Sequence, residues 1–337
     1  MLIAQNISLK PFNSFGIEAI AAYYSRIDTA AALEELLQEP IVQHQKILVL
    51  GGGSNLLFTK DVNGLVIHNQ IRGIHIIHET NDTIYLKVMA GEPWHELVQY
   101  CVVKNWGGIE NLSLIPGNTG AAPIQNIGAY GVEIKDLIHE VEAIQLTDGK
   151  KINLSNTDCA FGYRDSIFKN ELKNTCIITA VILRLTKNPI FNTSYGAIST
   201  ELEKMKVSTL SISAISQAVI NIRSSKLPNP SIIGNAGSFF KNPIISKTQY
   251  LQLLKDFPTM PSYPSRETVK IPAGWLIEQC GWKGYRKGDA GCYDKQALVL
   301  VNYGNASGAD IYELSTAIIQ SVQTKFGIYL EREVNII

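Results

Sequence analysis

The chain carries no net charge, no apolar run long enough to cross a bilayer and no closely spaced pair of cysteines. Its 30 Lys and Arg balance its 30 Asp and Glu, so no overall electrostatic field attracts a polyanion. The longest apolar runs, such as CIITAVILRL at 176–185, are of strand length and fall short of the ~20 residues of a membrane-spanning helix. We therefore expect neither a nucleic-acid partner nor membrane insertion.

The cysteines and histidines do not form the patterns of a metal site or a catalytic triad. The 5 cysteines make an odd set without a C-x-x-C pair, which argues against a disulfide framework and a zinc knuckle. All 6 histidines lie at or before His139, so a Ser-His-Asp triad would need its base from the first half of the chain. His75 and His78 alternate as strand residues do and lack a third ligand, so we interpret them as structural and expect no metal.

The beginning of the sequence, MLIAQNISLKPF, has no basic segment followed by a long apolar core. Those two features mark a secretory signal peptide. Together with the cysteine pattern, this predicts a protein of the reducing cytoplasm. With 337 residues, the chain is long enough for two or three domains.

Glycine and proline are concentrated in the stretch 108–133, GIENLSLIPGNTGAAPIQNIGAYGVE. Glycine weakens both helices and strands, and proline lacks the donor N–H, so this stretch predicts a shaped loop. Its unobstructed backbone N–H and C=O groups suit a large, flat, hydrogen-bonding ligand. An elaborate surface turn is the alternative that this stretch alone leaves open.

A second glycine cluster, GGGSN at 51–55, follows the apolar strand KILVL. A dinucleotide-binding G-x-G-x-x-G fingerprint would open a helix and precede an acidic residue by about 20 positions. Leu56 takes the place of the third glycine, and the chain continues through a turn towards another strand. The fingerprint is therefore absent, but consecutive backbone N–H groups in this turn can still form a nest for a pyrophosphate.

Periodicity predicts a mixture of helices and strands. Residues 28–39 are typical of a helix capped by Asp28, with three leucines on one face: Leu33, Leu36 and Leu37. Asp148-Gly149 between alternating segments predicts a hairpin with a two-residue turn. The chain closes with the predicted strand IYLEREVNII at 328–337. Further helices are predicted to begin at Pro93, near Ser213, at Pro272 and at Gly308.

A series of sequence blocks occurs in an order that resembles one known family. The blocks are GGGSN, NLSLIPGNTGAAPIQNIGAYGVE, FGYRDS, KLPNP, GNAGSFFKNP, PAGWLIEQCGWKG and LEREV. Together they resemble the UDP-N-acetylenolpyruvoylglucosamine reductases, the MurB family of bacterial peptidoglycan synthesis. The matching blocks run from residue 13 almost to the last residue. SYG around Tyr195 is similar to the substrate-covering loop of the longer family subtype.

The resemblance implies an α+β protein, in which a two-part FAD-binding fold of the vanillyl-alcohol-oxidase type precedes a C-terminal α+β substrate-binding domain. The two FAD-binding subdomains are expected at 1–70 and 71–205, and the substrate-binding domain at 206–327. The terminal strand at 328–337 is expected to return to the active site or to the first subdomain. These boundaries are implied by the family and not by the residue pattern.

The implied activity is the NADPH-dependent reduction of UDP-N-acetylenolpyruvoylglucosamine to UDP-N-acetylmuramate. FAD is the implied cofactor, held without a covalent bond, and NADPH is the co-substrate. The implied partner is therefore a small-molecule UDP-sugar, and we expect a monomer. The two glycine-rich segments match the FAD-binding segments of the family. The implied FAD contacts are Gly51, Gly52, Gly53, Ser54, Asn55, Pro116, Gly117, Gly120, Gln125, Asn126, Ile127, Gly128, Ala129, Tyr130 and Gly131.

Three residues match catalytic positions of the family. Arg164 of FGYRDS corresponds to the residue that stabilises the charge developing on the substrate's carboxylate side. Ser238 of GNAGSFFKNP corresponds to the proton donor, a role that serine can fill because the intermediate is strongly basic. Glu333 of LEREV corresponds to the carboxylate partner, either as a protonated donor or as an orienter of arginine or water. Glu331 would share its face in a strand and is the alternative.

Further residues are carried over as contacts of the substrate or of NADPH: Tyr195, Arg223, Lys226, Asn242 and Gln296. Arg223 and Lys226 suit a diphosphate or a 2′-phosphate, although a basic pair at a helix end can also offset terminal carbonyls. The sequence departs from the commonest family pattern at Asn118-Thr119, where small residues such as Ser-Val are frequent. This departure concerns local flavin contacts.

Two other functions remain open at this point. A flavin oxidase or dehydrogenase of the vanillyl-alcohol-oxidase type would act on an alcohol or hydroxy acid, but no C-terminal histidine cluster supplies its base. A non-catalytic nucleotide-sugar- or flavin-binding regulator would have no need of a proton donor such as Ser238.

Overall fold

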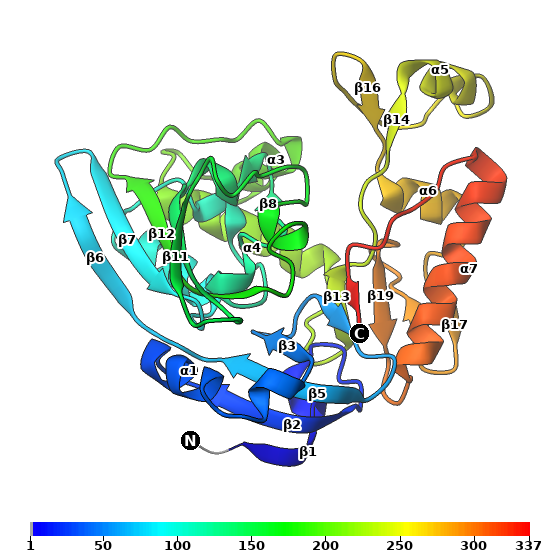
Figure 1. Cartoon of the computed structure of the whole chain (residues 1–337). Coiled ribbons are helices and arrows are strands. Elements are labelled where there is room, and N and C mark those ends of the chain that lie inside the picture. The colour runs from blue at the N-terminus through cyan, green and yellow to red at the C-terminus, as the bar shows by residue number, and fades with distance from the viewer. Residues whose placement is uncertain (1–2) are drawn as a thin grey trace. The chain divides into compact units, whose positions relative to one another are not determined.

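The computed structural model describes residues 3–337 of the chain (Figure 1). The chain divides into two compact units. The first unit contains the residues up to 7, 21–52 and 62–225, and the second contains 8–20, 53–61 and 226–337. The predicted domain boundaries after residues 70 and 205 both lie within the first unit, and the division into three domains stays a prediction.

The smaller sheet of the first unit has the strand order β1-β2-β5-β3, and β2 and β3 both run parallel to β5. Parallel strands need a crossover between them, which the helix α1 supplies here. As predicted, the leucines of α1 are buried in one cluster with Ile27, Leu65 and Ile67 of the sheet. These elements are β1 (Ala4–Ser8), β2 (Ile20–Ile27), α1 (Ala30–Leu37), β3 (Ile47–Leu50) and β5 (Val62–Asn69).

The cap of α1 differs from the prediction. The helix begins after Thr29, whose hydroxyl oxygen accepts a hydrogen bond from the backbone N–H of Ala32 at 3.0 Å. Asp28 instead pairs with Arg26 at 2.8 Å. The prediction of Asp28 was therefore wrong by one residue, because two adjacent residues can both cap a helix and the backbone decides which one does.

The larger sheet of the first unit is antiparallel, with the order β11-β10-β12-β7-β6. The predicted hairpin at Asp148-Gly149 is confirmed, since this turn joins β10 to β11 and Gly149 has a φ of +71°. The strands are β6 (Ile74–Glu79), β7 (Thr83–Met89), β10 (Ile138–Gln145), β11 (Lys151–Ser155) and β12 (Cys176–Thr186).

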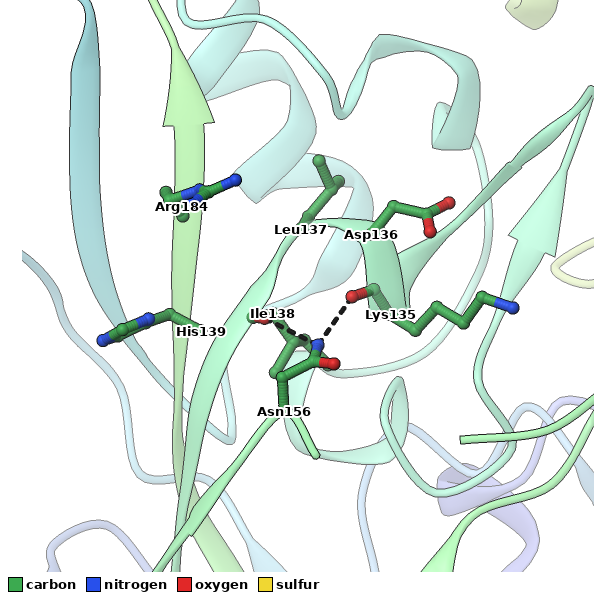
Figure 2. A pocket seen from close by; sticks show the side chains of 7 residues that line it. All are labelled: Lys135, Asp136, Leu137, Ile138, His139, Asn156 and Arg184. Carbon is green, nitrogen blue, oxygen red and sulfur yellow. Dashed lines mark hydrogen bonds between the residues drawn. The ribbon is translucent and has the colours of Figure 1, made fainter. Parts of the chain in front are cut away.

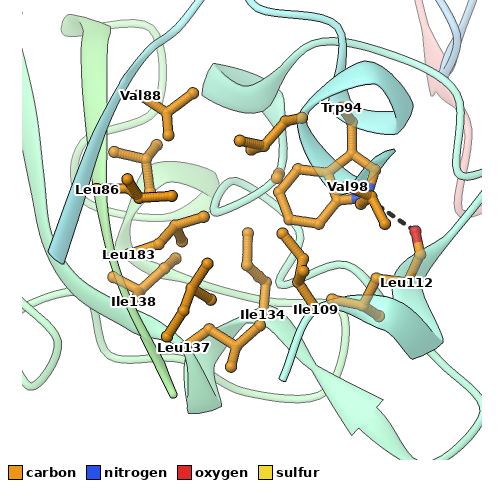
Figure 3. Packing of buried hydrophobic residues seen from close by; sticks show 14 of the residues in the cluster. Leu86, Val88, Trp94, Val98, Ile109, Leu112, Ile134, Leu137, Ile138 and Leu183 are labelled. Atoms are coloured by element: carbon orange, nitrogen blue, oxygen red, sulfur yellow. Dashed lines mark hydrogen bonds between the residues drawn. The ribbon is translucent and has the colours of Figure 1, made fainter. Parts of the chain in front are cut away.

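The main core of the first unit joins this sheet to the helix α2 (Trp94–Val103) and to the glycine-rich loop (Figure 3). Trp94 is 1% exposed, and its Nε1 donates to the carbonyl oxygen of Leu112 at 2.9 Å. Ile109 and Leu112 of the loop are buried in the same cluster. The loop is therefore anchored by burial of apolar surface, which stabilises it by roughly 1.5–3 kcal/mol for each large side chain. The remaining helices and strands of this region are α3 (Gly196–Lys204), α4 (Ile212–Lys226), β8 (Gly128–Ala129) and β9 (Val132–Glu133).

The second unit has a sheet of order β13-β19-β18-β17, with α7 beside it (Figure 1). The rings of Phe257, Trp275 and Phe326 pack together where α6 meets α7. These elements are β13 (Gly234–Ser238), α6 (Ala273–Gln279), β17 (Arg286–Lys287), β18 (Ala290–Cys292), β19 (Val299–Asn302) and α7 (Gly308–Phe326). A separate small sheet carries the helix α5 (Lys247–Asp256) and consists of β14 (Ile244–Ser246), β15 (Tyr263–Pro264) and β16 (Thr268–Lys270).

The terminal segment forms less strand than the sequence predicts. Only β20 (Asn335–Ile336) is a strand, and it pairs in parallel with β4 (Leu56–Leu57). Upstream of it, Arg332 makes an isolated bridge with Phe240. Ile328, Leu330 and Val334 are buried, so the alternating pattern reflects burial rather than membership of a sheet. Short 3-10 helices complete the chain: Lys10–Phe12, Val42–His44, Glu110–Leu112, Thr119–Ala121, Ile134–Asp136 and Ile167–Lys169.

Candidate active site

The glycine-rich loop at 108–133 is held in one shape by buried polar side chains. Glu110 is 2% exposed, and its Oε2 accepts the backbone N–H of Gly108 at 2.6 Å. Burial raises the pKa of the Glu110 carboxyl, against the opposing effect of the backbone N–H groups that it binds. Asn111 donates to the carbonyl oxygens of Tyr130 at 3.0 Å and Asn192 at 2.9 Å. The alternative of a solvated surface turn does not fit this degree of burial and bonding.

Gly51 and Gly52 approach the centre of this loop closely. A Cβ atom on Gly52 would lie 2.9 Å from the Cα of Gly117 and 2.9 Å from Oδ1 of Asn118, where no side chain can fit without a shift. Asn118 is 9% exposed, and within residues 3–337 its buried Nδ2 has no hydrogen-bond partner. A buried donor without an acceptor is costly unless a ligand supplies one. The bare backbone and the unsatisfied amide both fit a phosphate-containing cofactor such as FAD.

Arg164 lies in a tight turn that is closed by a bridge between Gly162 and Asp165. Its φ is +55°, a left-handed conformation that side chains rarely adopt and that clusters at functional sites. Its Nη2 donates to the carbonyl oxygen of Gly128 at 2.8 Å, and its Nη1 donates to that of Asn126 at 3.3 Å. The guanidinium therefore lies against the last part of the glycine-rich loop, in the segment predicted to contact the flavin.

Gly128 leaves room for this approach. A Cβ on Gly128 would lie 3.2 Å from Nη1 of Arg164 and 3.0 Å from Cγ of Glu133. It would also lie 3.0 Å from the carbonyl oxygen of Val132, so these neighbours would have to shift by a few tenths of an ångström. The glycine thus permits the contact between the loop and Arg164.

Tyr130, Tyr195 and Arg223 lie together in the first unit. The rings of the two tyrosines meet edge to face with centroids 5.4 Å apart. The Tyr130 hydroxyl interacts with the Arg223 guanidinium, and Nε of Arg223 donates to the carbonyl oxygen of Leu114 at 3.3 Å. Burial raises the pKa of Tyr130 and lowers that of Arg223, because both charged forms lose hydration. A phosphate placed beside Arg223 would restore the lost solvation of its charge.

His95 belongs to the same environment and was missed by the sequence analysis. Its Nδ1 accepts the backbone N–H of Leu114 at 3.0 Å. Burial lowers the pKa of His95, and the positive charge of Arg223 lowers it further. His95 lies in α2, whose sequence pattern is dominated by its apolar face. Nothing in the sequence therefore marks this histidine as a site residue.

The second unit brings Ser238, Glu333 and Asn55 into one neighbourhood. Ser238 ends β13, and the backbone N–H of Glu333 donates to the carbonyl oxygen of the next residue, Phe239, at 2.8 Å. The Asn55 amide donates to the carbonyl oxygen of Glu333 at 3.4 Å. Glu331 points elsewhere, since it pairs with Lys241 at 2.5 Å and its side chain is 65% exposed. This difference supports the choice of Glu333 over Glu331.

The other predicted residues of the second unit bind the beginning of α6 or are exposed. Asn242 Oδ1 accepts the first N–H of α6, from Ala273, at 2.8 Å. Gln296 Oε1 accepts the N–H of Leu298 at 3.3 Å and lies 2.9 Å from where a Cβ on Gly274 would be. Both side chains therefore meet the beginning of α6. Lys226 is exposed at the end of α4.

Among the predicted FAD contacts, Gly53 has a structural requirement of its own. Its φ is +61°, and a Cβ there would overlap the carbonyl oxygen of Phe12. Gly51 and Gly52 belong to the first unit, whereas Gly53, Ser54 and Asn55 belong to the second. The remaining predicted contacts lie in the first unit, within the loop just described: Pro116, Gly117, Gly120, Gln125, Asn126, Ile127, Gly128, Ala129, Tyr130 and Gly131.

A pocket of about 290 Å³ lies on the first unit, lined by residues from β10, β12 and the segments beside them. Figure 2 shows Asn156 in this pocket, where its amide donates to the carbonyl oxygens of Lys135 at 2.7 Å and Ile138 at 2.8 Å. None of the predicted site residues lines it.

Over residues 3–337, no group of three or more His, Cys, Asp or Glu is arranged to hold a metal ion. The helices of the described chain are all too short or too polar to cross a membrane.

Two family models match parts of the chain, and the one for an FAD-binding domain covers both glycine-rich segments. The family model for an FAD-binding domain matches residues 21–155, and that for the C-terminal domain of UDP-N-acetylenolpyruvoylglucosamine reductase matches 229–337. The curated UDP-N-acetylenolpyruvoylglucosamine reductase of Amoebophilus asiaticus is 52% identical, and that of Flavobacterium johnsoniae is 50% identical. Each alignment covers 100% of both chains.

The fold has a close counterpart among solved structures. The crystal structure of the UDP-N-acetylenolpyruvylglucosamine reductase (MurB) from Thermus caldophilus superposes with a TM-score of 0.70. The superposition covers 100% of this chain and 99% of the other at 24% identity. This likeness and the FAD-binding match confirm the predicted α+β fold with an FAD-binding part. About half of its residues are identical to those of curated reductases over the whole length, so the chain belongs to the UDP-N-acetylenolpyruvoylglucosamine reductase (MurB) family.

Proposed function

We propose that this chain uses NADPH and a non-covalently bound FAD to reduce UDP-N-acetylenolpyruvoylglucosamine to UDP-N-acetylmuramate, a precursor of peptidoglycan. The observation that carries the proposal is the full-length identity of 52% to a curated reductase of this name. The match to an FAD-binding domain over residues 21–155 supports the cofactor independently. The enzyme is thus an FAD-dependent oxidoreductase.

In the first unit, the residues that would hold FAD are Gly51, Gly52 and those of the glycine-rich loop at 108–133. Gly51 and Gly52 offer backbone N–H groups, and the Asn118 amide offers a buried donor beside them. When bound, FAD carries two electrons and a proton from NADPH to the double bond of the substrate. The part from Gln125 to Gly131 lies beside Arg164, which supports its assignment to the flavin.

Arg164 is the group that we expect to stabilise charge on the substrate. The substrate's C=C is conjugated to a carboxylate, so reduction at the distal carbon drives negative charge onto the carboxylate side. A guanidinium aimed at that charge strengthens its interaction as the transition state forms. Its two bonds to the carbonyl oxygens of Asn126 and Gly128 hold it in one plane, so little reorganisation is needed during the reaction.

Ser238 is the group that we expect to donate the proton that completes the reduction. Its place at the end of β13, next to the Phe239–Glu333 backbone bond, gives it a rigid support. Glu333 is proposed as its carboxylate neighbour, which either donates a hydrogen bond or orients arginine or water. A hydroxyl is a weak acid, but the enolate that it protonates is a strong base.

Tyr195 and Arg223 are proposed to bind the UDP-sugar or NADPH, with Lys226, Asn242 and Gln296 as further contacts. The pairing of Tyr195 with Tyr130, which itself meets Arg223, supports a common binding surface for a nucleotide phosphate. The small-molecule substrate and the zero net charge support a protein that binds no nucleic acid. The 5 cysteines, all without disulfides, support a cytoplasmic location, and a monomer is proposed.

The decisive experiment is to purify the protein, record its flavin spectrum and follow NADPH oxidation with and without UDP-N-acetylenolpyruvoylglucosamine. We expect a yellow protein whose NADPH oxidation requires the sugar and yields UDP-N-acetylmuramate. A colourless protein, or one indifferent to the sugar, would overturn the proposal. Oxidation of an alcohol with oxygen would indicate the oxidase alternative, and binding without turnover the regulator.

A further inference from the structure

Asn126 is one of the most completely engaged side chains in the first unit. It is 0% exposed, with a left-handed φ of +46°. Its Nδ2 donates to Oε2 of Glu133 at 3.0 Å and to the carbonyl oxygen of Gly162 at 2.9 Å. Its Oδ1 accepts the backbone N–H of Lys135 at 3.1 Å. Because an amide has two N–H donors, both are used within the protein.

These bonds link Asn126 both to the turn that carries Arg164 and to one of the carbonyl oxygens that its guanidinium binds. Gly162 closes the turn that carries Arg164, through reciprocal backbone bonds with Asp165. The carbonyl oxygen of Asn126 itself accepts Nη1 of Arg164 at 3.3 Å. Asn126 therefore fixes the backbone of the turn that carries Arg164. It also supplies one of the two carbonyl oxygens that accept hydrogen bonds from the Arg164 guanidinium.

The position demands asparagine for three physical reasons. The side chain must supply two N–H donors and one acceptor, which aspartate and leucine cannot do. It must adopt a left-handed backbone conformation, which asparagine tolerates better than most residues. It must also face the carboxylate of Glu133, whose Oε2 additionally binds Lys135 Nζ at 2.7 Å. A neutral amide at position 126 avoids the repulsion that a second carboxylate would cause there.

We propose that Asn126 is a positioning residue that sets the orientation of the Arg164 guanidinium, and through it the rate at which the bound sugar is reduced. This inference rests on the proposed function, in which Arg164 stabilises charge on the substrate's carboxylate side. Since that charge arises only when the sugar reacts, Asn126 acts on the reduction of the sugar and not on the reduction of the flavin by NADPH.

The test compares Asn126→Asp with a matched control, Asn156→Asp. Both asparagines use their Nδ2 to bind two acceptors in the same unit, and Asn156 binds the carbonyl oxygens of Lys135 and Ile138 (Figure 2). Asn156 makes no bond to the turn of Arg164. Rapid mixing measures the two half-reactions separately, first with NADPH and then with the sugar.

For Asn126→Asp we expect the rate of flavin reoxidation by the sugar to fall about 10- to 100-fold, as for loss of orientation at a charge-stabilising group. Because Asn126 is also one of the predicted FAD contacts, FAD content is measured first and both rates are expressed per bound flavin. On that basis the NADPH half-reaction should lose clearly less than the sugar half-reaction. The substitution places a second carboxylate next to Glu133, and such a pair retains a proton to higher pH. The loss should therefore shrink as the pH falls. Asn156→Asp should change both half-reactions less than about twofold, with no new pH dependence.

A double-mutant cycle separates positioning from a merely structural role. In an Arg164→Lys background, Asn126→Asp should lower the reoxidation rate by less than about threefold, because the group that it orients is already gone. Equal losses in both half-reactions, a full loss in the Arg164→Lys background, or the same loss in Asn156→Asp would each overturn the inference.

The orientation of the Arg164 guanidinium can also be measured without any reaction, so the positioning role can be tested independently of the proposed function. Arginine side-chain NMR should show separate Nη signals for Arg164, because two carbonyl oxygens restrict rotation about its Nε–Cζ bond. In Asn126→Asp these signals should merge, and in Asn156→Asp they should stay separate. If the wild-type protein ignores the sugar but shows this pattern, the proposed function fails while the positioning role stands. If Asn126→Asp does not fold, Glu133→Gln should give a smaller loss in the same half-reaction, and an equal loss in both would refute the role.

Discussion

Gly52→Ala tests whether the contact between the two glycine-rich segments shapes the FAD site. The added Cβ would lie 2.9 Å from the Cα of Gly117 and 2.9 Å from Oδ1 of Asn118. The amide end of Asn118 can rotate away, but the backbone of Gly117 cannot. The segment around Gly117 must therefore move by about half an ångström to reach ordinary contact. Overpacking of this kind costs about 1–3 kcal/mol, which corresponds to about a 5- to 140-fold weaker affinity for FAD if the strain falls on the FAD-binding conformation.

Gly51→Ala is the matched comparison, because the atom nearest to a Cβ on Gly51 would be the Cβ of Asn118, at an ordinary contact distance of 3.7 Å. That variant reports the effect of a methyl group in the same turn without a backbone clash. The assay is titration of the apoprotein with FAD, followed by quenching of flavin fluorescence. We expect Gly52→Ala to bind FAD at least fivefold more weakly than Gly51→Ala. Affinities within twofold of each other would refute the reasoning.

Three further predictions concern the proton donor, the core and pH. Ser238→Ala should leave flavin reduction by NADPH intact but stall reduction of the sugar, as rapid mixing would show; equal loss in both steps would mean that the serine has another role. Trp94→Phe should lower the free energy of unfolding by about 1–3 kcal/mol in urea, because the buried carbonyl oxygen of Leu112 loses its donor; a change below about 0.5 kcal/mol would contradict this. Burial raises the pKa of Glu110 above its ordinary value of 4.5, so its stabilising contribution is complete below that value and is lost as the pH rises through the folded-state pKa. Glu110→Gln should remove this part of the pH dependence of unfolding, and an unchanged profile would show that Glu110 does not cause it.

Local features of the fold could be predicted from the sequence because their causes lie within a few residues. The buried face of α1, with Leu33, Leu36 and Leu37, follows from helical spacing. The turn at Asp148-Gly149 follows from the backbone freedom of glycine. In contrast, the short extent of β20 depends on whether a partner strand lies beside residues 328–334, which no pattern within those residues encodes.

The candidate site was predictable only as a set of matching motifs. Spacing alone gave no reason to place Arg164 against Gly128, because the guanidinium of Arg164 binds a backbone carbonyl oxygen, a group that every residue carries. Asn118 looked like a departure from a family pattern, and its buried amide became visible only beside Gly52. His95 carries no signal at all, since its environment is set by burial and by the charge of Arg223, which is far away in the sequence.

The pairing of β20 with β4 has a consequence for how the protein is made. The carbonyl oxygen of Ile337 accepts both the backbone N–H and the hydroxyl of Thr59, 278 positions earlier. Contacts of such separation are slow to form, because a long loop must close before they stabilise anything. The second unit, which combines residues 8–20 with 226–337, therefore completes its structure only after residue 337 has been synthesised. The first unit needs no residue beyond 225, so it can fold while the rest of the chain is still being synthesised.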